Sequence, residues 1–219
     1  MNLRRVLLQT VYPSLCRQCS VVIVPEDVFC DVCTATIKPV VTAFLPLTKK
    51  TTLKVFAVSN YIAPMRFLVT RKFAGDVLAA RQIADMINTF IPLKNHSVDV
   101  LVPVPLHWTR YAARGYNQAH VIAHRLGKHL NVPVIRAVRR AHKTAFQWQQ
   151  TADVRRQNVK EAFDIAWWYK RNRLDFLTGK HVVIVDDLCT TGATLMAVAK
   201  VLAQAKPASI TAVVACRAV

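Results

Sequence analysis

Residues 182–194, which read VVIVDDLCTTGAT, decide the fold of this chain. Four apolar residues predict a short buried strand, two adjacent acids follow it, and a hydroxyl-rich loop with one glycine leads into a helix expected over 193–205. In an open sheet of parallel strands, ligands bind at the carboxyl ends of the strands. The N–H groups at the start of a helix suit a phosphate. The segment therefore predicts an α/β domain with an anion site after this strand.

The side chains of this loop are of two kinds. Threonine hydroxyls can donate hydrogen bonds to a phosphate, and the glycine lets the backbone come close to it. The two acids would repel a phosphate, and they suit the hydroxyls of a sugar or a hydrated Mg²⁺. The implied ligand is a ribose 5-phosphate with two free hydroxyls. The alternative is a helix cap without a ligand, for which two acids at the end of a buried strand are costly. The residues expected to bind are Asp186 and Asp187 for the sugar and Thr190, Thr191, Gly192 and Thr194 for the phosphate.

The rest of the chain alternates between strand and helix patterns. Such alternation predicts an α/β domain with a mostly parallel sheet, which we place over residues 53–219. The expected strands are 53–58, 98–104, 134–138, 182–185 and 210–216, and the expected helices are 65–72, 76–90, 117–130 and 193–205.

A second basic motif follows another expected strand. Residues 102–107 read VPVPLH, and Arg110 and then the run RGYNQ over 114–118 lead into a helix. Two arginines, Arg110 and Arg114, and a glycine before a helix start indicate an anion site, here for a pyrophosphate. The alternative is a basic loop in which Asn117 serves as the helix N-cap.

Four of the six cysteines form a paired pattern, Cys16, Cys19, Cys30 and Cys33. Four thiolates surround Zn²⁺ tetrahedrally, and two intervening residues let each pair bind from one tight turn. With all four positions filled the site is closed, so the zinc would be structural and would supply folding energy to a small module over residues 1–45. Two disulfides or four free thiols are the alternatives, and a cytoplasmic location disfavours the disulfides.

The charge of the chain is its most unusual bulk property. Among 219 residues, 30 are Lys or Arg and 12 are Asp or Glu, so the formal net charge is +18. Such an excess favours anionic partners such as nucleic acid, phosphorylated metabolites or an acidic membrane face, and a basic protein without such a partner is the alternative. No stretch approaches the roughly 18–20 uncharged apolar residues of a membrane span, so we expect a cytoplasmic protein without membrane insertion.

Two clusters, over residues 136–143 and 167–173, interleave cations with flat rings. This arrangement suits single-stranded DNA, because bases stack on the rings while cations contact the phosphates. The alternative is core or loop aromatics beside ordinary solvated charges. His120 and His124 have the spacing of metal ligands on a helix, but they lie off its apolar face, so we expect a solvated stripe. The predicted nucleic-acid-binding residues are Arg139, Arg140, Lys143, Trp168, Lys170 and Arg171.

The loop quoted first resembles the motif with which type I phosphoribosyltransferases bind phosphoribosyl pyrophosphate (PRPP). Together with the four cysteines, an ordered series of motifs resembles the ComF family, the competence-associated phosphoribosyltransferase-like proteins that include the GntX group. The likeness runs from Cys16 to Ala193. The motifs before the loop are Val102-Pro103-Val104-Pro105-Leu106, Arg114-Gly115-Tyr116-Asn117-Gln118, Lys143-Thr144 with Gln147, and Arg155 with Asn158-Val159 and Ala162-Phe163.

The resemblance implies a type I phosphoribosyltransferase-like fold. Asp186 and Asp187 would face the ribose, the loop including Ala193 would wrap the 5-phosphate, and Mg²⁺ would bridge the pyrophosphate. It also implies a protein of DNA uptake in natural transformation, which binds PRPP or a similar phosphosugar, holds incoming single-stranded DNA and works with a helicase-like partner. The alternative is an active phosphoribosyltransferase that joins a base or amine acceptor to ribose 5-phosphate and releases pyrophosphate. Its catalytic residues would be Asp186, Asp187, Arg110 and Arg114, the arginines stabilising the leaving pyrophosphate.

Overall fold

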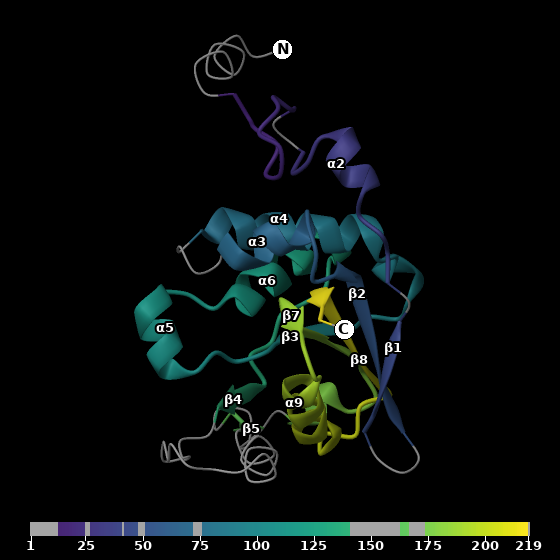
Figure 1. The fold of residues 1–219 in the computed structure, drawn as a ribbon. Helices are drawn as coiled ribbons and strands as arrows, with labels where there is room; N and C mark the ends of the chain where they lie inside the picture. The colour runs from purple at the N-terminus through teal and green to yellow at the C-terminus, as the bar shows by residue number, and fades with distance from the viewer. Residues whose placement is uncertain are drawn as a thin grey trace.

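A mostly parallel sheet forms the centre of the molecule (Figure 1). The structure is a computed structural model that describes residues 13–24, 27–40, 42–47, 51–71, 76–140, 163–166 and 174–218. The strands of the sheet are β1 (Ala43–Pro46), β2 (Thr52–Asn60), β3 (Val100–Pro103), β6 (His181–Val185), β7 (Leu188–Cys189) and β8 (Ser209–Arg217). They run in the order β1-β2-β8-β6-β3, and β7 pairs with β8. β1 is antiparallel to β2, and the other pairs are parallel.

Apolar side chains cover both faces of the sheet, because successive residues of a strand point to opposite sides. In β6, Val182 and Ile184 belong to one apolar cluster, whereas Val183 and Val185 belong to the other. All four side chains are buried. The uninterrupted apolar run of this strand is therefore explained by a parallel strand with both faces covered, as predicted from the sequence.

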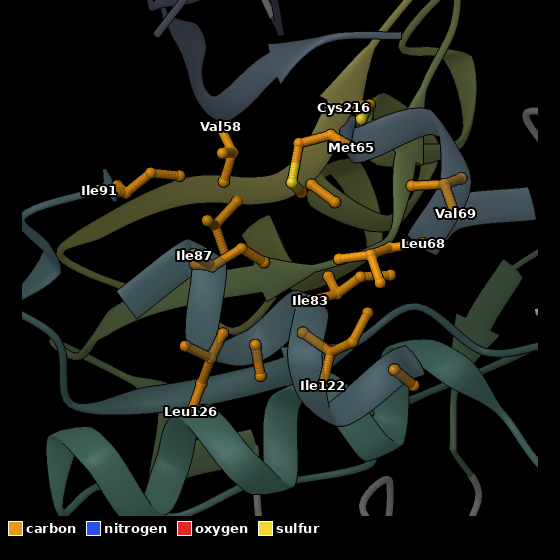
Figure 2. Packing of buried hydrophobic residues seen from close by; sticks show 14 of the residues in the cluster. Val58, Met65, Leu68, Val69, Ile83, Ile87, Ile91, Ile122, Leu126 and Cys216 are labelled. Carbon is orange, nitrogen blue, oxygen red and sulfur yellow. The ribbon is translucent and has the colours of Figure 1, made fainter. Parts of the chain in front are cut away.

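Helices cover these two faces. The helices α3 (Met65–Arg71), α4 (Val77–Phe90) and α6 (Gln118–Leu130) contribute to one cluster, and α9 (Ala193–Ala203) contributes to the other. Figure 2 shows the first cluster, in which the side chains are almost entirely buried: Met65 and Leu68 from α3, Ile83 and Ile87 from α4, and Ile122 and Leu126 from α6. The four helices expected from the sequence are thus confirmed. Among the described helices, none combines the length and the apolar character that crossing a bilayer requires.

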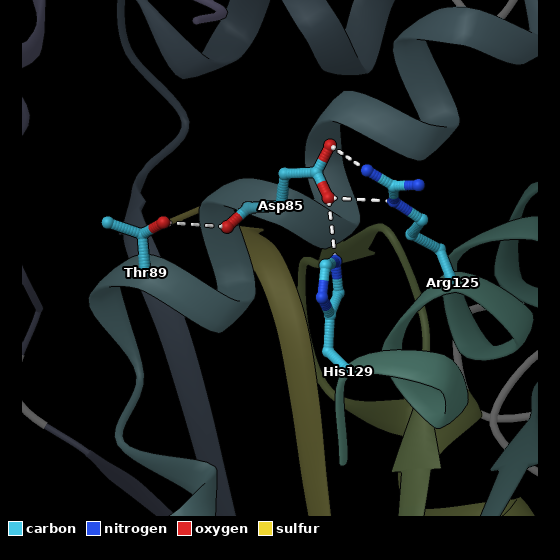
Figure 3. A network of polar contacts seen from close by, with 4 residues as sticks. All are labelled: Asp85, Thr89, Arg125 and His129. Carbon is cyan, nitrogen blue, oxygen red and sulfur yellow. Dashed lines mark hydrogen bonds and ion pairs between the residues drawn. The ribbon is translucent and has the colours of Figure 1, made fainter. Parts of the chain in front are cut away.

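A polar network also joins α4 to α6 (Figure 3). Arg125 donates two hydrogen bonds to the Asp85 carboxylate, at 2.8 and 3.3 Å, and a ring nitrogen of His129 lies 2.8 Å from the same group. The Arg125 side chain is 45% exposed, and a pair at this exposure contributes at most about 1 kcal/mol. Truncating a fully buried leucine such as Leu126 costs about 2–5 kcal/mol. Apolar contact, rather than the ion pair, therefore holds the two helices together.

The strand expected over 134–138 is wrong in its position. Val134 forms only an isolated bridge with Leu101 of β3. The strand in this region is β4 (Val138–Arg140), which pairs antiparallel with β5 (Phe163–Ile165). Its partner lies far along the chain, so periodicity alone could not place it. Sequence patterns also did not reveal α2 (Asp31–Ala35), α5 (Trp108–Arg114), the short 3-10 helices η2 (Leu93–Asn95) and η3 (Leu174–Leu177), β1 or β7.

The cysteine-containing segment packs on the apolar cluster that also includes α3 and α4. The boundary expected at residue 45 falls within β1, where Ala43 lies opposite Val55 of β2. β1 therefore belongs to the sheet, and the division into a module over 1–45 and a domain over 53–219 stays a prediction. The buried residues of this segment are Cys16, Val28, Phe29, Cys33 and Ile37.

Candidate functional site

The carboxyl ends of β3 and β6 lie side by side. The two strands are parallel neighbours, with Pro103 opposite Val185. The N–H of Val104 donates to the carbonyl oxygen of Val185 at 2.9 Å, which extends the pairing beyond the end of β3. The segments that begin at Pro105 and at Asp186 therefore leave the sheet at the same edge, where ligands bind in open α/β sheets.

A cleft of about 490 Å³ opens between these segments. Its volume lies within the range of about 300–1,000 Å³ that small-molecule sites occupy. Five residues predicted for the phosphoribosyl site line it: Asp186, Asp187, Thr194, Arg110 and Arg114. The cleft thus joins the acidic motif after β6 to the basic motif after β3.

The two acids are fixed through their backbone. The N–H of Asp186 donates to the carbonyl of Val213 at 3.1 Å, and the carbonyl of Asp187 accepts from the N–H groups of Ala215 and Cys216, each at 3.2 Å. The N–H of Asp187 donates to Oδ1 of Asp186 at 2.9 Å. Both side chains are partly exposed in the cleft wall and do not enter the core. β8 therefore holds the acids where a ligand can reach them.

Three arginines stand in the walls of the same cleft. Arg110 and Arg114 come from α5, a helix where the sequence suggested a loop, and Nη1 of Arg114 donates to Oε1 of Gln118 at 3.1 Å. Arg140 comes from β4, and no spacing in the sequence indicated this position. Burial lowers the pKa of the Arg140 guanidinium, and the charge of Arg110 lowers it further. A bound anion would relieve the cost of these like charges.

The loop before α9 presents its threonines at the surface. Thr190, Thr191 and Thr194 are exposed, as is Ala193, and Thr194 is the member of this group that lines the cleft. The N–H of Ala193 lies 3.4 Å from Oγ1 of Thr191. The N-cap residue is a glycine and offers no side-chain oxygen to the first turn of α9. The dipole of α9 can therefore attract an anion to this helix start.

Gly192 has two structural reasons to be glycine. Its φ is +76°, in the left-handed region that L side chains rarely adopt. A Cβ atom at this position would also collide with the side chain of Leu45 from β1. From the sequence we expected the glycine to let a phosphate approach the backbone. In the structure, the missing Cβ atom also leaves room for the side chain of Leu45.

Asn117 connects the two parts of the basic motif. It occupies the N-cap position of α6, as the alternative expected, but its side chain makes no capping hydrogen bond. Nδ2 of Asn117 instead donates to the carbonyl oxygen of Val104 at 2.9 Å. The start of α6 is thereby tied to the end of β3.

The four predicted metal-ligand cysteines come together. Their sulfur atoms all lie within 4.8 Å of one another, and the sulfurs of Cys19 and Cys30 are 3.6 Å apart. A tetrahedral site with Zn–S bonds of about 2.3 Å separates its sulfurs by about 3.8 Å. None of the four described cysteines is in a disulfide. Burial alone would raise the pKa of the Cys16 thiol, but backbone N–H groups of Cys19, Cys30 and Gln18 lower it to about 6. Burial raises the pKa of the Cys33 thiol, so the cluster favours one thiolate before a metal binds. The cluster can therefore hold a metal ion.

The neighbouring arginine anchors this cluster to the domain. Nε of Arg17 donates to Oε1 of Gln82 in α4 at 3.0 Å, and its Nη1 lies 3.7 Å from Oδ2 of Asp76. Asp76 is the N-cap of α4 and accepts from the N–H of Ala79. The cysteine cluster is thus bonded to the start of this helix.

The predicted nucleic-acid-binding residues are only partly placed. Arg139 lies in β4, and its Nη2 donates to Oδ2 of Asp164 in β5 at 3.2 Å. Arg139 and Arg140 line a second, smaller cleft. Lys143, Trp168, Lys170 and Arg171 lie outside the described residues.

This chain is similar to a phosphoribosyl transferase domain and to proteins named for competence or DNA utilization. A family model described as the phosphoribosyl transferase domain matches residues 78–218. Competence protein F of Haemophilus influenzae is 32% identical over 156 residues, which cover 68% of this chain and 66% of that protein. The DNA utilization protein YhgH of Salmonella typhi is 31% identical over 175 residues, which cover 75% of this chain and 72% of that protein. More than a quarter of each relative therefore lies outside the match.

Solved structures include a more distant likeness. Adenine phosphoribosyltransferase from Saccharomyces cerevisiae matches over 78% of this chain and 78% of that chain, with 15% sequence identity and a TM-score of 0.35.

The double constraint on Gly192 makes a testable prediction. Gly192→Ala incurs the left-handed backbone cost of about 1–2 kcal/mol, and the side chain of Leu45 must also shift to admit the new Cβ atom. Gly179→Ala is the matched control, because Gly179 has a φ of +68° and an added Cβ there would meet no heavy atom within 4 Å. Urea unfolding should therefore show a larger loss of stability for Gly192→Ala. Leu45→Ala in the Gly192→Ala background should recover part of it, and equal losses for the two glycine variants would contradict the role of Leu45.

Proposed function

Because this chain belongs to the phosphoribosyl transferase domain family, and within it to the ComF proteins, we propose that it binds PRPP or a related phosphoribosyl ligand with Mg²⁺ and handles single-stranded DNA during DNA uptake in natural transformation. The main support for this ligand is the cleft, in which two acids and three arginines come together at the ends of neighbouring parallel strands.

The cleft offers a separate partner for each part of a phosphoribosyl pyrophosphate. The carboxylates of Asp186 and Asp187 accept hydrogen bonds from the ribose hydroxyls. The start of α9, with Thr194, binds the 5-phosphate. Arg110, Arg114 and Arg140 bind the pyrophosphate, since guanidinium groups match phosphate oxygens in charge and geometry.

The donor set of the cleft also fits Mg²⁺. Mg²⁺ prefers oxygen ligands and is commonly held by one or two carboxylates together with phosphates of the substrate. Asp186 and Asp187 are the carboxylates that line the cleft within the described residues. Mg²⁺ bound there would neutralise part of the charge on the pyrophosphate.

The role in DNA uptake is supported by the relatives and by the charge. One relative is named a competence protein and another a DNA utilization protein. The formal net charge of +18 favours association with a polyanion. We therefore propose single-stranded DNA as the macromolecular partner, and a helicase-like protein as a further partner implied by the family.

We propose Zn²⁺ as the metal of the cysteine cluster. Sulfur is the ligand type of structural zinc sites, and four cysteines leave no open position for chemistry. The metal would stabilise a segment that contributes few residues to the core.

A second function uses the same cleft. Transfer of the phosphoribosyl group to a base or amine acceptor requires stabilisation of the leaving pyrophosphate, and the cluster of three arginines supplies positive charge for this. PRPP binding is common to both functions. Release of pyrophosphate in the presence of an acceptor occurs only in the second.

The acids give the first functional prediction. Asp187→Asn removes a charge from the sugar and Mg²⁺ site with little change in size, so calorimetric titration with PRPP and Mg²⁺ should show at least a tenfold loss of affinity, about 1.4 kcal/mol. Asp175→Asn is the matched control, because Asp175 is an exposed acid in η3 outside the cleft. Wild-type affinity in Asp187→Asn would refute the proposed site. Pyrophosphate measured in the same samples with base or amine acceptors distinguishes the enzyme from the binding protein.

Binding of single-stranded DNA should depend steeply on salt. Cations that neutralise phosphates release counterions, so a protein that contacts about four phosphates of a single strand gives a slope near −3 in log affinity against log salt concentration. Fluorescence anisotropy with a labelled oligothymidylate between low and high salt measures the slope. An affinity that does not change with salt rejects this partner.

The zinc proposal predicts about one zinc per chain by elemental analysis. Cys30→Ser should lose the metal and lower the unfolding temperature, because one of four ligands is removed. Cys189→Ser should retain the metal, because Cys189 lies outside the cluster. Folded wild-type protein without bound metal would contradict the proposal.

A further inference from the structure

A second cleft of about 290 Å³ adjoins the first. Both clefts are lined by Pro105, Leu106, Asn117 and Arg140, so the segment after β3 forms a common wall. The second cleft lies among the end of β3, α5, the start of α6 and β4. Its distinctive polar and aromatic lining residues are Tyr111, Tyr116, His120, Arg136 and Arg139.

Two buried polar atoms of residues in this lining have no hydrogen-bond partner within the described residues. They are Nδ1 of His120 and Nε of Arg139. Buried polar groups in proteins are nearly always paired. Both residues line the cleft, so these donors lie close to the space that a polar ligand would fill.

The two unpaired nitrogens are hydrogen-bond donors. Nη2 of Arg136 lies 2.7 Å from Nε2 of His120, and a guanidinium only donates, so Nε2 accepts. Burial lowers the pKa of His120, and the charges of Arg136 and His124 lower it further, so the ring is neutral and carries its proton on Nδ1. Nε of Arg139 is an N–H donor as well. His120 is half-buried and contacts Arg136, whereas His124 is exposed, as the expected solvated stripe requires.

The rest of the lining suits a flat and negatively charged molecule. Tyr111 is 52% exposed and lines the cleft, so a planar ligand can stack on its ring. Apolar wall residues include Pro103, Val121 and Val138. Three guanidinium groups, those of Arg136, Arg139 and Arg140, supply positive charge for a phosphate.

We propose that the second cleft binds a nucleotide. The base stacks on Tyr111, beside His120 and Arg139, and its phosphate lies by Arg136 and Arg140. The source is either a free nucleoside monophosphate or one nucleotide of a single strand, and in the second case the inference rests on the proposed DNA binding. The site is separate from the acids that bind the phosphosugar.

The test compares Tyr111→Ala and Arg136→Ala with the wild-type chain. Both residues are exposed at the surface, so the variants should fold. Trp108→Ala is the aromatic control on the same helix, and Lys94→Ala is the charge control; both residues are exposed and outside the cleft. The probes are thymidine 5′-monophosphate by calorimetry and a labelled oligothymidylate by anisotropy. Deoxyribose 5-phosphate, which lacks the ring, is the ligand control.

Loss of a base-stacking ring should weaken nucleotide binding at least fivefold in Tyr111→Ala. Arg136→Ala should weaken it to a similar extent, and the two controls should bind as the wild type does. Deoxyribose 5-phosphate should bind more weakly than the monophosphate and be insensitive to Tyr111→Ala. A loss seen with the monophosphate identifies a free-nucleotide site, and a loss confined to the oligonucleotide identifies a site for a strand.

Wild-type affinity of both variants for both probes, or no binding of either probe to the wild-type chain, overturns the proposal. PRPP with Mg²⁺ is titrated into the same variants, and its affinity should be unchanged in Tyr111→Ala. Failure of PRPP to bind the wild-type chain would refute the phosphosugar ligand while leaving the nucleotide site standing. The two failures are therefore distinguishable.

Discussion

The parallel pairing of β3 with β6 is the constraint on which the site depends. Each strand ends in a segment of one charge: acids follow β6, and arginines follow β3. Neither segment alone can bind a sugar and a pyrophosphate together. The register places Pro103 opposite Val185, so the two segments start at the same level of the sheet. A shift of one residue would move a segment by about 3.3 Å and turn its strand residues to the opposite face, and the cleft would no longer combine both charges.

The parts of this site that could be predicted from sequence are local. The strand, acids, threonines and helix start over 182–194 are contiguous, so their order along the chain already gives their order in space. The parts that could not be predicted depend on distant contacts. Arg140 enters the cleft because β4 pairs with β5, and Leu45 covers Gly192 because β1 joins the edge of the sheet. The sequence did not predict α5, because none of its residues is buried and it therefore lacks an apolar periodicity.

Two contacts of the described N-terminal segment link it to the starts of helices α4 and α9. Arg17, next to the first cysteine, bonds to α4, and Leu45 fits against the glycine at the start of α9. The position of Leu45 is set by the antiparallel pairing of β1 with β2, in which it lies opposite Leu53. The loop before α9 is therefore shaped partly by a strand that lies well over a hundred residues before it. The sequence of the loop therefore explains only in part why residue 192 is a glycine, because the contact with Leu45 comes from a distant strand.

Arg140 relates the two clefts because its side chain lines both. Burial and the charge of Arg110 lower its pKa, so its positive charge is costly until an anion lies beside it. A phosphate held in either cleft removes that cost. A phosphate that then enters the other cleft gains less from the same guanidinium and also meets the negative charge of the first. If both proposed ligands bind, the shared arginine would make phosphosugar and nucleotide oppose each other, and because coupling free energies are reciprocal, each would weaken the other by the same factor.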